Sequence, residues 1–265
     1  MLERIQKYRR DLHQIPELEL ELPKTQRYLQ EALRDLPCSL SSPIPSSVVA
    51  FFDAGRKESI AFRSDMDALP VTEATGRAFA SRHTGCMHAC GHDGHMAMLL
   101  EFAHQLSAYY KELPHNVVLI FQPGEETPGG AEPMCKSGIF EQYHIKRIFG
   151  FHVWPMLDKG VIATRRNEFM ARSSEVNIDI TGKSAHAAKY QEGIDAMEIA
   201  ARYLLDVYTM EQEELSAETY RLLRFGLLKS GTVRNVVSNA ARMEGTLRAF
   251  QDETYQYMKK RMLEL

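Results

Sequence analysis

The sequence has few cysteines and no excess of basic charge, and both features exclude classes of protein. Four cysteines in 265 residues are too few for a disulfide scaffold, so we expect free thiols or metal ligands. The 32 Lys and Arg are outnumbered by 35 Asp and Glu, which leaves no positive excess for binding nucleic acid. No apolar run reaches the roughly 18 residues of a membrane span, and the N-terminus lacks the apolar segment of a signal peptide. We therefore expect a cytoplasmic protein with neither a nucleic-acid nor a membrane partner.

Motifs of covalent, nucleotide and redox chemistry are also missing. The sequence contains no G-x-S-x-G elbow, no Walker loop and no C-x-x-C pair. A serine hydrolase, a P-loop enzyme and a redox or structural zinc protein are therefore disfavoured. What remains is a chain with 44% hydrophobic and 25% charged residues, which is an ordinary globular composition. A chain of this length can bury a hydrophobic core that is stable without disulfide bonds or structural metal ions.

The pattern of apolar residues changes along the chain. The first part alternates between helical segments and short apolar runs, which predicts an α/β fold with a mostly parallel sheet. Its expected elements are helices within 3–36 and from an N-cap at Asp93, and strands at Val48–Asp53, Ser59–Arg63, Asn116–Gln122 and Ile148–Val153. From Glu175 the residues alternate strictly, as in an antiparallel sheet with one solvated face. We predict an α/β domain over 1–172 and an α+β domain over 173–265.

The densest group of chemically active residues is HACGHDGH, residues 88–95. On a helix, Cys90 and His92 would point about 200° apart, so they can converge only in a loop, which Gly91 permits. Thiolate and imidazole at this spacing predict a metal-binding pair. The alternative is a loop with a buried thiol and solvated histidines. Catalysis by Cys90 as a nucleophile is a minor possibility.

Acidic and histidine side chains follow three of the predicted strands. Glu125 and Glu126 come directly after the most apolar strand, where open α/β sheets place their ligands. His152 lies at the end of another strand, and Asp65 and Asp67 follow a third. Taken singly, each of these residues is as well explained by a solvated turn. Together they predict one metal-assisted hydrolase site.

The interpretation assigns each residue a role in that site. The ligands are predicted to be Cys90, His92, Glu126 and His152. A metal held there would lower the pKa of its water from about 15.7 towards about 7. Glu125 would then take the proton during attack on a carbonyl carbon and pass it to the leaving nitrogen.

Seven segments, in order along nearly the whole chain, resemble one family of enzymes. The segments are RRDLHQIPEL, SDMDALPVTEATG, MHACGHDGHMAML, FQPGEETPGGA, GFHVWP, GKSAHAA and SGTVRNVVSNAARMEGTLRAF. They resemble the metal-dependent amidohydrolases and peptidases that include aminoacylase, carboxypeptidase G and succinyl-diaminopimelate desuccinylase. The most similar branch is that of the bacterial N-acyl-amino-acid amidohydrolases, with hippurate hydrolase, indole-acetyl-amino-acid hydrolase and N-acetyldiaminopimelate deacetylase.

The resemblance implies a site with two divalent metal ions. Cys90 matches the bridging ligand and Glu125 the general base, while Asp67 keeps a supporting role. Asp65 stands where the wider family has a histidine ligand. Mn²⁺ is the expected metal, with Zn²⁺ or Co²⁺ as alternatives. The implied reaction is hydrolysis of the amide of N-acyl amino acids, and deacetylation of N-acetyldiaminopimelate in lysine synthesis is the alternative.

The resemblance also implies an inserted lid domain from about residue 173, through which the family forms homodimers. His186 matches a lid histidine that reaches the reacting carbonyl, and Asn235 and Arg248 match positions that hold substrate. Family members continue further and carry one more metal-binding histidine, whereas this chain has none after His186. The C-terminal part of the family fold is therefore expected to be absent, and a catalytically inactive truncated fragment is the competing hypothesis.

Overall fold

The computed structural model describes residues 1–265 and contains two compact units, Met1–Lys159 and Gly160–Leu265. The first unit holds the predicted catalytic residues up to His152, and the second holds His186, Asn235 and Arg248. None of the helices combines the length and the apolarity needed to cross a bilayer.

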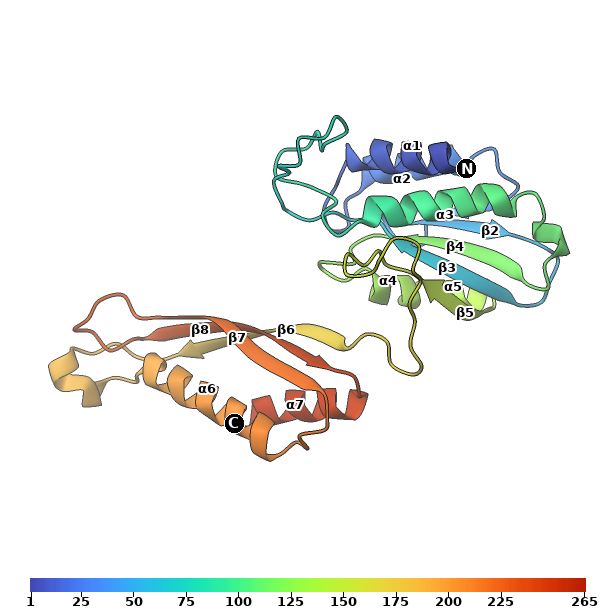
Figure 1. Ribbon diagram of the computed structural model, residues 1–265. Coiled ribbons are helices and arrows are strands. Elements are labelled where there is room, and N and C mark those ends of the chain that lie inside the picture. The colour runs from blue at the N-terminus through green and yellow to red at the C-terminus, as the bar shows by residue number, and fades with distance from the viewer. The chain divides into compact units, whose positions relative to one another are not determined.

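The first unit is built on a five-stranded sheet in the order β1-β2-β4-β3-β5 (Figure 1). The strands are β1 (Ser39–Ser41), β2 (Val48–Phe52), β3 (Ser59–Asp65), β4 (Asn116–Gln122) and β5 (Ile145–Gly150). β3 runs parallel to β4 and β5, whereas β2 is antiparallel to both of its neighbours. Only β2 runs against the other strands, so the predicted mostly parallel sheet is confirmed.

Helices cover both faces of this sheet (Figure 1). One face carries α1 (Leu2–His13), α2 (Pro23–Leu33) and α3 (His92–Leu106), the other carries α4 (Ala131–Lys136) and α5 (Ile139–Gln142), and a 3-10 turn, η1 (Tyr110–Glu112), precedes β4. In β4, Val117, Leu119 and Phe121 pack towards the long helices, and Val118 and Ile120 pack towards the short ones. Because both of its faces are buried, β4 is apolar at every position between its polar ends.

The second unit is a three-stranded antiparallel sheet in the order β6-β8-β7, with two helices on one face (Figure 1). Its elements are β6 (Arg172–Thr181), η2 (Ala187–Glu192), α6 (Ala196–Glu213), β7 (Arg221–Ser230), β8 (Ala240–Ala249) and α7 (Asp252–Glu264). Val207 and Met210 of α6 pack with Leu223 and Leu247 of the sheet and with Met258 of α7. The alternating exposure along β6 explains the alternating sequence from which the sheet was predicted.

Several element boundaries differ from the sequence-based prediction. Asp93 is not an N-cap: the cap of α3 is Gly91, whose φ of 89° suits glycine, and Asp93 lies inside the first turn. The predicted strand Ile148–Val153 ends at Gly150 because its apolar sequence continues into a loop, so His152 follows β5 by two residues. The helices predicted within 3–36 are two in number, Leu2–His13 and Pro23–Leu33.

The boundary between the predicted domains falls close to the division between the units. Residues 160–171 contain no helix or strand, and β6 begins at Arg172, where the prediction ends the first domain. The compact units themselves divide earlier, between Lys159 and Gly160.

Candidate metal centre

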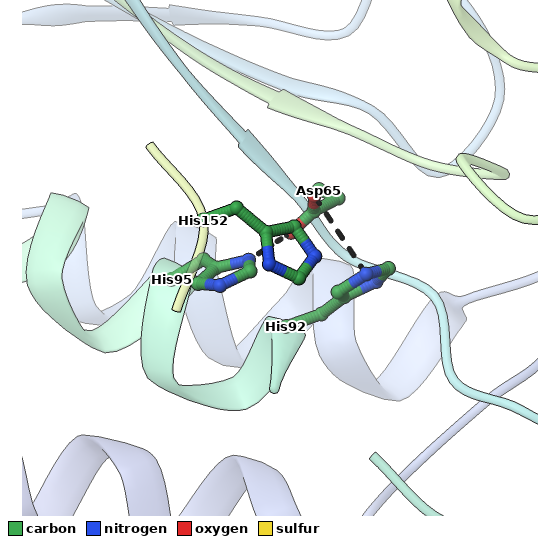
Figure 2. A group of neighbouring side chains, drawn as sticks. All are labelled: Asp65, His92, His95 and His152. Atoms are coloured by element: carbon green, nitrogen blue, oxygen red, sulfur yellow. Dashed lines mark hydrogen bonds and ion pairs between the residues drawn. The ribbon is translucent and has the colours of Figure 1, made fainter. Parts of the chain in front are cut away.

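The candidate metal centre lies at the carboxyl ends of the parallel strands. Asp65 ends β3 directly beside Gln122, which ends β4, and Arg63 pairs with Gly150 at the end of β5. The N-terminus of α3 reaches the same edge and carries His92. Parallel strands bring their carboxyl ends to one edge of a sheet, which is why residues from four distant segments meet here. Figure 2 shows Asp65, His92, His95 and His152 pointing into one common space.

Two histidines of the centre direct the lone pair of Nε2 into the common space. The Nδ1 atom of His92 donates to the backbone carbonyl of Asp67 at 2.8 Å, and that of His152 donates to the carbonyl of Val153 at 2.7 Å. Since a carbonyl can only accept, each Nδ1 carries the proton and each Nε2 keeps a lone pair. The Nε2 atom of His92 is buried and has no hydrogen-bond partner. A buried acceptor with this orientation is what a metal ligand requires.

Cys90 and Glu126 complete the set of potential ligand groups. Ligand atoms of Cys90, His92 and Glu126 all lie within 4.8 Å of one another. The Nε2 atom of His152 is 3.3 Å from the Cys90 sulfur. The structure thus brings together the four predicted ligands, although they come from the start of α3 and from the loops after β4 and β5. Thiolate, imidazole and carboxylate are ligands that Zn²⁺ accepts, and imidazole and carboxylate also suit Mn²⁺.

Asp67 orients both His92 and the loop that carries Glu125 and Glu126. Its two carboxylate oxygens accept the backbone N–H groups of Glu125 at 2.8 Å and of Glu126 at 3.0 Å, and its carbonyl holds His92. Burial acts to raise the pKa of Asp67, but the contact with His92 and the two N–H bonds outweigh it, and the net pKa is lowered. Asp67 is therefore ionised and positions the backbone of both glutamates as well as the His92 ring.

Asp65 and His95 form a pair that sequence reasoning did not assign. They belong to a second group that could hold an ion, together with His92 and His152 (Figure 2). However, His95 donates from Nδ1 to Asp65 at 2.7 Å and accepts the Val153 N–H at Nε2 at 2.9 Å, so both of its nitrogens are used. The pair therefore fixes the loop that carries His152. The spacing of His92 and His95, one turn apart on a helix, was the available signal.

The thiol of Cys90 and the carboxylate of Glu125 are both disfavoured in their ionised forms by burial and by neighbouring carboxylates. Burial, a hydrogen bond with Glu126 and the charges of Glu125 and Asp65 raise the pKa of Cys90 to about 12. Burial and the neighbouring Glu126 also raise the pKa of Glu125, whose carboxylate lies 3.9 Å from the Nε2 atom of His92. A bound cation would stabilise every one of these groups in its ionised form, so the residues present fit a divalent metal.

The predicted substrate-binding residues lie in the second unit. His186 is the N-cap of η2, and its Nδ1 accepts the Ala188 N–H at 3.1 Å. The adjacent Ala187 N–H bonds to the carbonyl of Asn235, so the structure brings His186 and Asn235 together. Arg248 lies on β8 and is exposed.

A family model described as Peptidase family M20/M25/M40 matches residues 61–241, which span the predicted ligands and base in the first unit as well as His186 and Asn235. The chain belongs to this family. An uncharacterized hydrolase of Staphylococcus epidermidis is 37% identical over 263 residues, a match that covers 98% of this chain and 69% of that protein. The predicted family resemblance is thereby confirmed, and this M20 member is a hydrolase.

Solved structures agree with the assignment to the M20 family. A chain from methicillin-resistant Staphylococcus aureus has a TM-score of 0.92 at 29% identity, covering 99% of this chain and 70% of that one. Bacillus subtilis YxeP, a dinuclear metal binding peptidase from the M20 family, has a TM-score of 0.79 at 31% identity and covers 98% and 67%. The metallohydrolase fold predicted for this chain is thus confirmed.

Replacing Asp67 with asparagine tests its positioning role. Asparagine offers one acceptor oxygen where the carboxylate offers two, so one of the Glu125 and Glu126 N–H groups would face an amide NH₂. We expect Mn²⁺ affinity to fall by about 10–100-fold, as for other groups that orient a ligand. Isothermal titration with Mn²⁺ measures it, with Asp35→Asn on the surface as the matched control. Equal affinities in the two variants would contradict the role.

Proposed function

We propose that this M20-family hydrolase cleaves the amide bond of N-acyl amino acids with the help of divalent metal, releasing an amino acid and a carboxylic acid. The observation that carries the proposal is the convergence of four potential ligand groups, from Cys90, His92, Glu126 and His152, beside the carboxylate of Glu125. Two metal ions are proposed by analogy with the dinuclear YxeP, and Mn²⁺ is the proposed metal.

The chain's own residues suit the proton transfers of amide hydrolysis. Bound metal would supply an acidified water and polarise the carbonyl of the amide. Glu125 is half-exposed on the side of His92 Nε2, and its raised pKa brings it closer to neutral pH, where a base can both take and return a proton. Its neighbour Glu126 faces Cys90 instead, so two adjacent carboxylates serve different tasks.

The second unit supplies the proposed substrate contacts. We propose that His186 donates a hydrogen bond to the reacting carbonyl, that Asn235 assists it, and that Arg248 holds the substrate carboxylate. The adjacency of His186 and Asn235 supports the first two assignments. A guanidinium matches a carboxylate with two parallel hydrogen bonds, which favours Arg248 for the third. Homodimer formation through this unit belongs to the same proposal.

The proposal is tested by amine release from a panel of N-acetyl amino acids and N-acetyldiaminopimelate. The chain is assayed after removal of metal with a chelator, and again after addition of Mn²⁺. We expect turnover only with metal, and the preferred substrate then separates general N-acyl-amino-acid hydrolysis from N-acetyldiaminopimelate deacetylation. Esters of the same acyl groups serve as the control for unspecific hydrolysis. Turnover of esters alone, or none with any metal, would contradict the proposed function.

A further inference from the structure

A cavity of about 930 Å³ opens beside the metal centre, entirely within the first unit. Cys90 and His152 form part of its wall, so the cavity is continuous with the side chains that converge on the proposed metal. Much of the remaining wall is apolar and includes Phe79, Trp154 and Met156. A cleft of this size next to the reacting groups is large enough for a substrate portion well beyond an acetyl group.

Most of the charge on the cavity wall is neutralised within the protein. Arg9 pairs with Asp93 at 3.1 Å. His13 lies between two carboxylates, 2.8 Å from Asp93 and 3.3 Å from Glu73. Glu73, the only carboxylate on the wall, also accepts the backbone N–H of Ser81 at 2.6 Å. These groups therefore have little net charge left for a ligand.

Two arginines on the wall have no such partner. Arg10 and Arg77 both line the cavity, and neither forms an ion pair with a carboxylate of the chain. The guanidinium of Arg10 is held over the ring of Phe79 at 5.4 Å, which places a cation against an apolar surface. Arg10 and Arg77 are therefore the groups on this wall whose charge no carboxylate of the chain neutralises.

We propose that this cavity binds the far end of the substrate, an apolar stem that ends in a carboxylate. Arg10 and Arg77 hold the carboxylate, because a guanidinium fork matches it in both charge and geometry. Phe79 and Trp154 pack against the stem while the amide lies at the metal centre. This inference rests on the proposed function and names its substrate class: N-acyl amino acids with a second carboxylate several bonds from the amide.

The first test compares three substrates that differ in the distal group. N-acetyl-2-aminopimelate carries the second carboxylate on the amino-acid side, N-adipoylglycine carries it on the acyl side, and N-acetylnorleucine has none. We expect kcat/KM to be at least about 10-fold higher for one of the dicarboxylates. The double variant Arg10→Gln/Arg77→Gln should reduce that preference by about 10–100-fold, the usual effect of losing hydrogen bonds to a charged group.

A matched control separates the cavity from general charge effects. Arg27→Gln/Arg34→Gln removes the same charge from exposed arginines at α2 that form no ion pair and do not line the cavity. This control should keep the substrate preference of the parent protein. A preference that is absent, or that both double variants reduce equally, would overturn the inference.

The second test measures binding without turnover. Trp154 is the only tryptophan of the chain, lines the cavity and is 53% exposed, so its fluorescence reports a ligand that covers it. N-acetyl-2-aminopimelate and N-adipoylglycine are each titrated into Glu125→Gln, with and without the double arginine change. We expect saturable quenching or a blue shift, with Kd raised about 10–100-fold by the arginine changes.

The two tests distinguish failure of the inference from failure of the proposed function. Turnover of N-acetylnorleucine with no arginine-dependent preference or binding would overturn the cavity assignment and leave the function standing. Arginine-dependent binding without turnover of any substrate would support the cavity and count against the function. Absence of both turnover and a tryptophan response would overturn both.

Discussion

Glu125→Gln is expected to lower kcat for amide hydrolysis by about 10²–10⁴-fold, the contribution of a well-placed general base. Glutamine has nearly the same shape but cannot take a proton from water. The backbone N–H of residue 125 still bonds to Asp67, so the loop and the neighbouring Glu126 should stay in place. Amine release from an N-acetyl amino acid at saturating Mn²⁺ measures the effect, and metal analysis should show an unchanged load.

Glu126→Gln is the matched control for this experiment. It removes a carboxylate from the adjacent position, which lies with Cys90 and His92 in the ligand group. We expect this variant to lose metal and to regain part of its activity when Mn²⁺ is raised, whereas Glu125→Gln should not respond. If both variants respond to added Mn²⁺ in the same way, the division of roles between the two carboxylates is wrong.

Cys90→Ala is expected to weaken Mn²⁺ or Zn²⁺ binding by more than about 100-fold, beyond the effect of losing a group that only orients a ligand. The pH dependence gives a sharper signature. The pKa of the metal-free thiol is about 12, so it is protonated at pH 7, whereas only the thiolate binds metal. Binding must therefore release a proton, and Kd should fall about tenfold for each pH unit between pH 7 and 9.

Calorimetric titration in two buffers of different ionisation enthalpy counts the protons released. Cys90→Ala should release about one proton fewer than the parent protein, because the thiol that loses its proton is gone. Cys135→Ala is the matched control, since Cys135 is an exposed free cysteine outside the site. If the parent protein and Cys90→Ala release the same number of protons on binding metal, Cys90 is not a ligand.

The sequence predicts the elements of this fold best where one physical cause dominates. β4 begins and ends at the predicted residues, because burial of both of its faces leaves a clear apolar run. The end of β5 and the start of α3 were misplaced. There the apolar sequence continues past the last hydrogen-bonded pair, and Asp93 serves α1 through His13 instead of capping its own helix.

The candidate site was predictable as a set of residues but not as an arrangement. The chemistry of Cys90, His92, Glu125, Glu126 and His152 follows from their types and from their places near element ends. Which nitrogen of each histidine carries the proton could not be predicted. The carbonyls of Asp67 and Val153 fix the two tautomers, and their positions depend on the folded backbone. The same holds for the Asp65–His95 pair, whose partners are 30 residues apart.

By itself, the sequence determined the family, the α/β class of the first unit and the kinds of donor at the site, since these depend on local pattern and residue type. Only the tertiary structure decided that Asp67 accepts the backbone N–H groups of the paired glutamates. It also decided that both ring nitrogens of His95 are hydrogen-bonded within the protein. It alone placed Arg10 and Arg77 without partners on the wall of a cavity that reaches Cys90. Hydrogen bonding and charge balance between distant segments depend on how those segments pack, and no short stretch of sequence contains that information.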